Sequence, residues 1–217
     1  MIIKKIFKYK PSLGDINSYL YILIQNKLLN FWGKVVFRLK AHMFGIEFKD
    51  GIDCYGPIHI LRAPKSFISI GNNVLIISSS KRSTANSIYA PTRLRTLSPT
   101  AKIIIDDNVS LNGTSITARS KKIQIGKGTM IGSNVVIMDS DYHALWPPEN
   151  RPMNPAFDRD DDVIIGSNVW IGISCIILKG VIVGDNSVIA SGSVVTKDVH
   201  PNVLAGGVPA RTIRKLP

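Results

Sequence analysis

The stretch that decides the fold begins as IGSNVWIG at residues 165–172 and continues to residue 200. Along it an aliphatic residue returns every six positions: Ile165, Ile171, Ile177, Val183, Ile189 and Val195. A period of six fits neither an α-helix, with about 3.6 residues per turn, nor an alternating strand, with a period of about 2. It is typical of a chain that runs straight, turns a corner and repeats, as in a parallel β-helix. Three such sides make a coil of about 18 residues, so residues 165–200 predict two coils.

The same pattern extends toward the N-terminus, irregularly at first. It gives IGNNV at residues 70–74 and IDDNV at residues 105–109, slips by two residues, and resumes at Ile125. We therefore expect an all-β domain, a parallel β-helix, over residues 51–204, followed by a basic tail at 205–217.

Two segments interrupt the repeats. Residues 78–101 are polar and basic, and residues 139–162 have neither the repeat nor its composition. Because stacked coils satisfy one another's backbone groups, each inserted segment should protrude as a loop. A loop that emerges from a rigid scaffold is a common place for substrate contacts.

Residues 1–50 form a distinct N-terminal region. They hold nine Lys and Arg residues and three acidic residues, which is half of the net charge of +12. A broad apolar stripe predicts a helix over residues 15–40, but its longest uncharged run, Ile16 to Asn26, is shorter than the roughly 20 residues that span a bilayer. Two alternatives remain open. The helix packs on its own domain or on a partner subunit, or it rests on an anionic membrane surface.

Charge and cysteine content limit the classes of partner. No nucleic-acid-binding module is recognisable, and the aromatic residues are not interleaved with the basic ones, so we expect no nucleic acid. An anionic small molecule or a membrane surface explains the charge as well. Cys54 and Cys175 cannot form a disulfide framework, and Cys175 occupies an inward repeat position where a thiol is inert. With no cleavable signal pattern, we expect a cytoplasmic protein, with peripheral contact at the inner face of the membrane as an open alternative.

The loop at 139–162 offers a candidate general base. An imidazole titrates near neutrality, so His143 is suited to remove a proton from a hydroxyl or an amine. Asp139 or Asp141 could hold the ring in the required tautomer. No metal site is expected, because His59, His143 and His200 are far apart and no two of them have the close spacing of metal ligands.

Three segments resemble the sugar O-acetyltransferases of the hexapeptide-repeat acyltransferase family. They are IIGSNVWIG at 164–172, VGDNSVIASGSVVTKD at 183–198, and GVPAR at 207–211 followed by Arg214. The resemblance is dense over about 105–215 and looser over 58–104. It implies a left-handed β-helix, a homotrimer, and acetyl-CoA as cosubstrate without a metal.

The resemblance also implies roles for individual residues. His143 matches the family's general base, on the loop that interrupts the coils. The acceptor is expected to bind Asn112, by the family's register, and loop residues Tyr142, Trp146 and Arg93. The residues expected to bind acetyl-CoA are Trp170, Gly172, Ser191, Thr196, Lys197, Arg211 and Arg214. Trp170 has an alternative role, in which its ring packs against a neighbouring subunit.

Residues 1–50 and 78–101 depart from the small-sugar acetyltransferases and resemble enzymes encoded with surface-polysaccharide assembly. The predicted function is acetyl transfer from acetyl-CoA to a sugar hydroxyl of a capsule, O-antigen or exopolysaccharide, with a lipid-linked acceptor left open. The nearer alternative is an N-acetyltransferase of a nucleotide-linked amino sugar. The more distant one is a non-catalytic β-helix scaffold.

Overall fold

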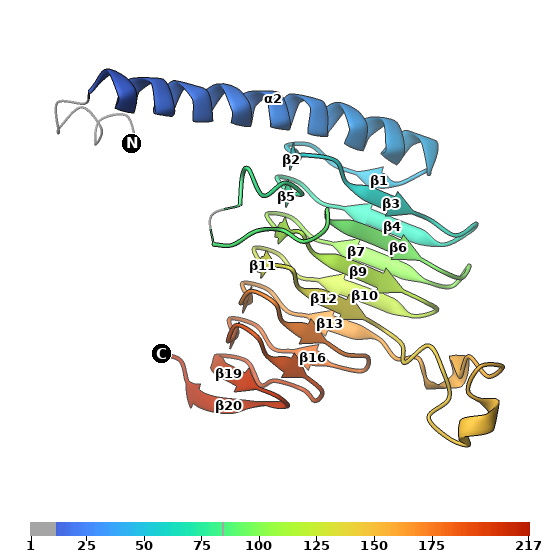
Figure 1. The fold of residues 1–217 in the computed structure, drawn as a ribbon. Helices are drawn as coiled ribbons and strands as arrows, with labels where there is room; N and C mark the ends of the chain where they lie inside the picture. The colour runs from blue at the N-terminus through green and yellow to red at the C-terminus, as the bar shows by residue number, and fades with distance from the viewer. Residues whose placement is uncertain (1–11, 84) are drawn as a thin grey trace.

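Parallel strands wind into a three-sided β-helix in the computed structural model of the chain, which describes residues 12–83 and 85–217 (Figure 1). The first side contains β1 (Glu47–Phe48), β4 (Phe67–Ile70), β7 (Lys102–Ile105), β10 (Lys122–Ile125), β13 (Val163–Ile165) and β16 (Ile182–Val183). The second contains β2 (Asp53–Tyr55), β5 (Leu75–Ile77), β8 (Ser110–Asn112), β11 (Met130–Ser133), β14 (Trp170–Ile171), β17 (Val188–Ile189), β19 (Val203–Gly207) and β20 (Ala210–Lys215). The third contains β3 (His59–Leu61), β6 (Arg93–Thr96), β9 (Ser115–Ala118), β12 (Val136–Met138), β15 (Ile176–Ile177) and β18 (Val194–Val195).

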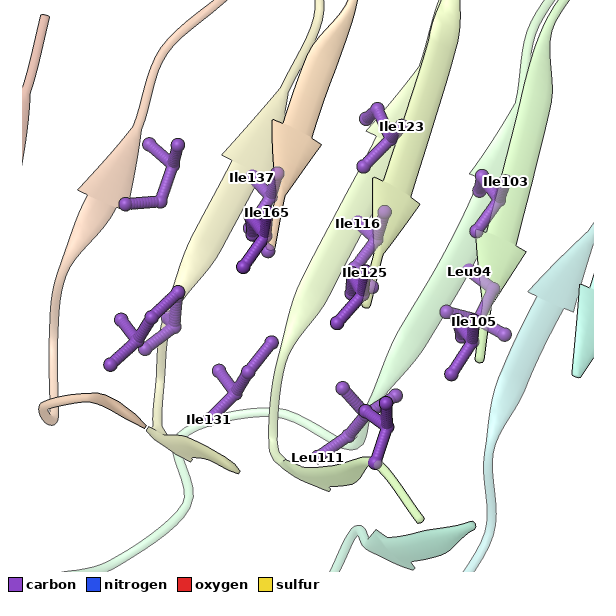
Figure 2. Packing of buried hydrophobic residues seen from close by; sticks show 14 of the residues in the cluster. Leu94, Ile103, Ile105, Leu111, Ile116, Ile123, Ile125, Ile131, Ile137 and Ile165 are labelled. Atoms are coloured by element: carbon purple, nitrogen blue, oxygen red, sulfur yellow. The ribbon is translucent and has the colours of Figure 1, made fainter. Parts of the chain in front are cut away.

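The core is a set of aliphatic rows that run along the coil axis. In register, Ile105 pairs with Ile125 and Ile125 with Ile165, so their inward side chains stack from coil to coil. Figure 2 shows these rows between the sheets. The three isoleucines are buried, and burying such a side chain contributes roughly 1.5–3 kcal/mol. The aliphatic residues of the six-residue pattern are therefore the side chains that fill the interior of the three-sided coil.

The two-residue slip in the repeat has a structural cause. Val183 pairs with Ile165, 18 positions earlier (183 − 165), whereas Ile125 pairs with Ile105, 20 positions earlier (125 − 105). The extra length lies between the inward residues Ile116 and Ile125, which are nine positions apart (125 − 116), whereas Ile177 and Val183 are six apart (183 − 177); this segment contains the corner at 119–121. This corner takes part in the buried network described below.

Asparagines occupy the recurring corners of the second and first sheets. Asn168 and Asn186 both have positive φ angles, of 55° and 58°. Asparagine tolerates this left-handed conformation better than most residues. The Asn186 amide also donates to Asn202 Oδ1 at 3.0 Å, so the corners are linked along the axis. This explains why phrases such as IGSN and VGDN recur in the sequence.

The predicted interruption at 78–101 is only partly correct. Arg93–Thr96 forms β6, which pairs with β3 and β9, so the loop ends at residue 92. The reason is the alternation in RLRT, in which Leu94 is fully buried between two partly exposed arginines. The basic composition of this segment led to its assignment as a loop, although it contains a strand whose inward residue packs in the core.

The predicted N-terminal helix is confirmed as α2 (Leu13–Met43). Ser12 and Asp15 form a capping box at its start, which satisfies backbone N–H groups that a helix terminus leaves unpaired. The helix lies across the end of the β-helix, with its first half reaching beyond the coils (Figure 1). Only Gly33, Phe37 and Ala41 are buried along it. Among the described residues no helix combines the length and hydropathy that a membrane crossing requires.

The ends of the predicted domain fall close to strands. β1 begins at Glu47, inside the predicted N-terminal region, and β19 crosses the predicted boundary at 204. The predicted basic tail forms β20, which pairs antiparallel with β19. Four of the lysines counted in the basic N-terminal region lie outside the described residues: Lys4, Lys5, Lys8 and Lys10.

Candidate active site

A groove of about 330 Å³ opens along the second sheet, beside the loop at 78–92. Four of the residues predicted for the site line this groove: Asn112, Trp170, Gly172 and Ser191. They come from successive coils, because β8, β11, β14 and β17 are neighbours in the sheet. The register of the coils therefore brings one acceptor candidate and three coenzyme candidates into one groove, although Asn112 and Ser191 are 79 positions apart in the sequence (191 − 112).

Glycine residues in the wall of this groove allow neighbouring coils to pack closely. A Cβ on Gly172 would lie 2.6 Å from the Ser191 nitrogen, and one on Gly132 would lie 2.8 Å from the Gly172 carbonyl carbon. These distances are too short for any larger residue. Glycine therefore allows the backbones of successive coils to approach closely along this wall.

The loop at 78–92 forms the other wall, which sequence reasoning identified only as a basic segment. Ser83 and Ala85 line the groove. Asn134 holds the loop from both sides, because its amide donates to Ser87 O at 2.9 Å and its Oδ1 accepts from the Tyr89 N–H at 2.9 Å. The recurrent corner asparagine was visible in the sequence, but its contact with the loop was not.

A second, basic groove lies at the C-terminal end. Lys197 and Arg211 line this groove of about 260 Å³, together with His200. Thr196 follows β18 and Arg214 lies in β20, where it pairs with Leu204; both are exposed. Two cations in one groove can bind phosphate groups. The predicted coenzyme residues are thus divided between two grooves.

His143 lies in the loop at 139–162, and its hydrogen bonding suits a base. Its Nδ1 is 3.1 Å from the Arg151 carbonyl oxygen. A carbonyl only accepts, so this contact fixes the tautomer with a proton on Nδ1. Nε2 is then left with a lone pair that can take a proton from a substrate.

Neither predicted aspartate contacts the His143 ring. Asp139 is buried and accepts the N–H groups of Arg119, Ser120 and Lys121 at 2.7, 3.0 and 2.8 Å. Asp141 instead pairs with Lys179 at 2.6 Å. The tautomer is held by a backbone carbonyl, a partner that has no side-chain signature in the sequence.

Burial raises the pKa of Asp139, although its three backbone N–H bonds act in the opposite direction. Burial also opposes ionisation of Asp160, but hydrogen bonds from Arg119, Ser120 and Ser140 outweigh it and leave the Asp160 pKa below its ordinary value. Two carboxyls at the base of the same loop are therefore shifted in opposite directions.

Arg119, which sequence reasoning missed, anchors this loop. Its guanidinium donates to Asp160 through Nε at 2.8 Å and Nη2 at 2.5 Å, and also to the carbonyls of Pro155 and Ala156. The ring of Phe157 lies 4.4 Å from it. The sequence offered one sign of this role, because Arg119 is a charged residue close to the two-residue slip in the repeat.

Of the other predicted acceptor residues, Tyr142 lies beside the same anchor. The Arg119 guanidinium is 5.6 Å from the Tyr142 ring centroid. Burial, then the charge of Asp139, raises the Tyr142 pKa, while Arg93 lowers it from nearby. Trp146 is 76% exposed. Tyr142 and Arg93 are thus neighbours, whereas Trp146 extends into solvent.

Within one chain the structure does not bring His143 to Asn112. His143 does not line the Asn112 groove. Its loop leaves the third side of the prism after β12, while the loop at 78–92 leaves the second side after β5 (Figure 1).

Among residues 12–83 and 85–217, no group of three or more metal-ligating side chains occurs.

Comparison with known proteins accounts for the repeats. Residues 162–197 match the bacterial transferase hexapeptide family (six repeats). This stretch of the chain carries the six-residue repeats of that family. The predicted resemblance to hexapeptide-repeat acetyltransferases is confirmed, and the coil is a left-handed parallel β-helix like its structural neighbours.

One curated relative is the galactoside O-acetyltransferase of Escherichia coli (strain K12), 59% identical over 94 residues. These residues cover 43% of this chain and 44% of that protein. The chain spans 44% to 63% of the length of the curated relatives first matched.

Solved structures extend the likeness over most of the chain. A galactoside acetyltransferase in complex with coenzyme A is 27% identical with a TM-score of 0.51, covering 82% of this chain and 68% of that one. The polysialic acid O-acetyltransferase OatWY is 25% identical with a TM-score of 0.51, covering 77% and 88%. AntD, an N-acyltransferase from Bacillus cereus, has a TM-score of 0.61 at 19% identity, covering 83% and 88%, and this shows the shared fold.

Proposed function

We propose that this chain transfers an acetyl group from acetyl-CoA to a sugar hydroxyl of a surface polysaccharide. The observation that carries the proposal is the groove that collects Asn112, Trp170, Gly172 and Ser191. The names of similar proteins support the same chemistry, since a galactoside acetyltransferase binds coenzyme A and OatWY acts on polysialic acid. The groove's open side would admit an internal sugar of a long chain.

The reaction would proceed by direct transfer. The acceptor oxygen attacks the thioester carbonyl carbon while His143 Nε2 takes its proton, and the Nδ1 contact with Arg151 O steadies the imidazolium that forms. A backbone N–H on the glycine-lined wall would donate to the oxyanion, an effect worth about 3 kcal/mol. The C–S bond then breaks, and the thiolate of coenzyme A recovers the proton from the imidazolium. No acyl-enzyme is needed.

A homotrimer would complete the site. His143 and Asn112 lie on different sides of one prism, so three copies around an axis could set the His143 loop of one against the Asn112 groove of the next. Lys197, Arg211 and Arg214 would bind the phosphates of the coenzyme. Buried free thiols at Cys54 and Cys175 fit a reducing cytoplasm.

Products identified by mass spectrometry test the proposal. Acetyl-CoA is supplied with a galactoside, oligosialic acid or a nucleotide-linked amino sugar. An ester on either hydroxyl acceptor supports the proposed function. An amide on the amino sugar alone would replace it with N-acetyl transfer, which the fold of AntD favours. The absence of coenzyme A binding in calorimetry would favour a non-catalytic scaffold.

A further inference from the structure

A third groove, between α2 and the coil, is not used by the proposed reaction. It encloses about 370 Å³, which is within the size range of small-molecule sites. Ile24, Leu28 and Trp32 line it from the helix, and Pro57 lines it from the coil. Tyr21, Gln25 and Lys81 also line it. Such a groove suits a hydrocarbon chain.

The helix wall of this groove is open to solvent. Ile24, Leu28 and Trp32 are 57%, 54% and 61% exposed. Large apolar side chains gathered on one exposed face mark an interaction site in most soluble proteins. Further along the same helix, Gly33, Phe37 and Ala41 are buried. Within residues 12–83 and 85–217, no segment covers this exposed face, which leaves it open to an occupant.

Lys81 gives the groove a positive edge. Gln25 Nε2 donates to Lys81 O at 3.4 Å, which ties the start of the loop at 78–92 to the helix. Within the described part of the chain, no carboxylate forms an ion pair with Lys81. An occupant with an anionic group beside its apolar chain matches this arrangement.

The same loop connects the apolar groove to the candidate active site. Lys81 lines the first, and Ser83 and Ala85 line the second beside Asn112. Two residues of backbone span at most about 7 Å. The backbone of Lys81 is therefore adjacent to the edge of the candidate active site.

We propose that the α2 groove binds the hydrocarbon chain of a lipid-linked acceptor, with its phosphate at Lys81 and its sugar directed along the loop toward Asn112. This inference rests on the proposed acetyl transfer and names its acceptor class. Three features favour it over a second copy of the chain: the positive edge, the nearly apolar lining, and the continuity with the acceptor groove.

Calorimetry with octyl phosphate below its micellar concentration tests the groove on the full chain. We expect binding of octyl phosphate, weaker binding of octyl glucoside, and none of inorganic phosphate. Ile24→Asp should weaken the affinity for octyl phosphate at least tenfold, and Lys81→Gln should weaken it at least fivefold. The matched controls are Ile16→Asp, exposed on the same helix outside the groove, and Lys102→Gln on the coil.

Two results would overturn the inference: no binding of octyl phosphate, or equal weakening by the control variants. A change of oligomeric state in Ile24→Asp, seen by sedimentation, with octyl phosphate binding intact, would assign the groove to a second copy. Coenzyme A titrations in the same samples separate the two proposals. Intact coenzyme A binding without octyl phosphate binding rejects the lipid groove alone. The converse rejects acetyl transfer and with it the acceptor class.

Discussion

The guanidinium of Arg119 and the carboxylate of Asp160 form a buried ion pair, with Nη2 and Oδ1 2.5 Å apart and side-chain exposures of 5% and 0%. The pair joins a corner of the coil to the far end of the loop that carries His143. Because Asp139 receives the backbone N–H groups of the same corner, both ends of the loop are fastened to residues 119–121.

Removing Arg119 should unfasten the loop. Arg119→Met leaves Asp160 charged and buried, which typically costs about 3–5 kcal/mol of unfolding free energy. Urea unfolding measures the loss, and hydrogen exchange should rise within residues 139–162. Lys122→Met is the matched control, since it removes the more exposed pair with Asp162 at 3.9 Å and should cost less than about 1 kcal/mol. Equal losses in both variants would contradict the anchoring role.

The Asp160 carboxylate should make stability depend on acid pH. Its pKa in the folded chain is lowered, so the ionised group stabilises the fold above the ordinary carboxyl value, about 3.9, and this contribution disappears as pH falls through the folded pKa. The urea midpoints of the wild type and Asp160→Asn should therefore converge between pH 5 and pH 2. A constant difference across that range would show that Asp160 is not ionised in the fold.

Gly33 should be required for the docking of α2. A Cβ at this position would lie 2.0 Å from the Cys54 carbonyl oxygen, so Gly33→Ala must push the helix from the coil at a cost of about 1–3 kcal/mol. Gly14→Ala on the same helix meets only Ser12 Oγ at 3.6 Å and should leave stability unchanged or slightly higher. Thermal unfolding of both variants decides, and a neutral Gly33→Ala would mean that the helix lies elsewhere.

Neither cysteine should react in the folded protein. Burial raises the pKa of Cys54 to about 12 and also raises that of Cys175, so both thiols stay protonated at pH 8. A thiol-specific chromogenic disulfide should therefore titrate no thiol in buffer and two in urea. Rapid labelling of Cys175 before unfolding would show that its coil is open.

The coil could be predicted from the sequence, because its core repeats one side chain per six residues and each row is buried. Arg93 in β6 was assigned to a loop, since composition outweighed the two-residue alternation around Leu94. At the site, the resemblance to the acetyltransferases implied roles for Asn112, Trp170 and Gly172, and the structure places the three in one groove. The contacts of His143 with Arg151 O, and of Arg119 with Asp160, could not be predicted, because irregular loops have no period that relates sequence distance to contact.

Acetyl transfer by His143→Ala tests the central claim most directly. Initial rates of coenzyme A release are measured with a galactoside or oligosialic acid acceptor, beside wild type and a His42→Ala control on α2. General-base catalysis predicts a loss of at least about a hundredfold in turnover, with coenzyme A affinity and oligomeric state unchanged. Turnover within a few-fold of wild type would contradict the assignment of His143 as the base.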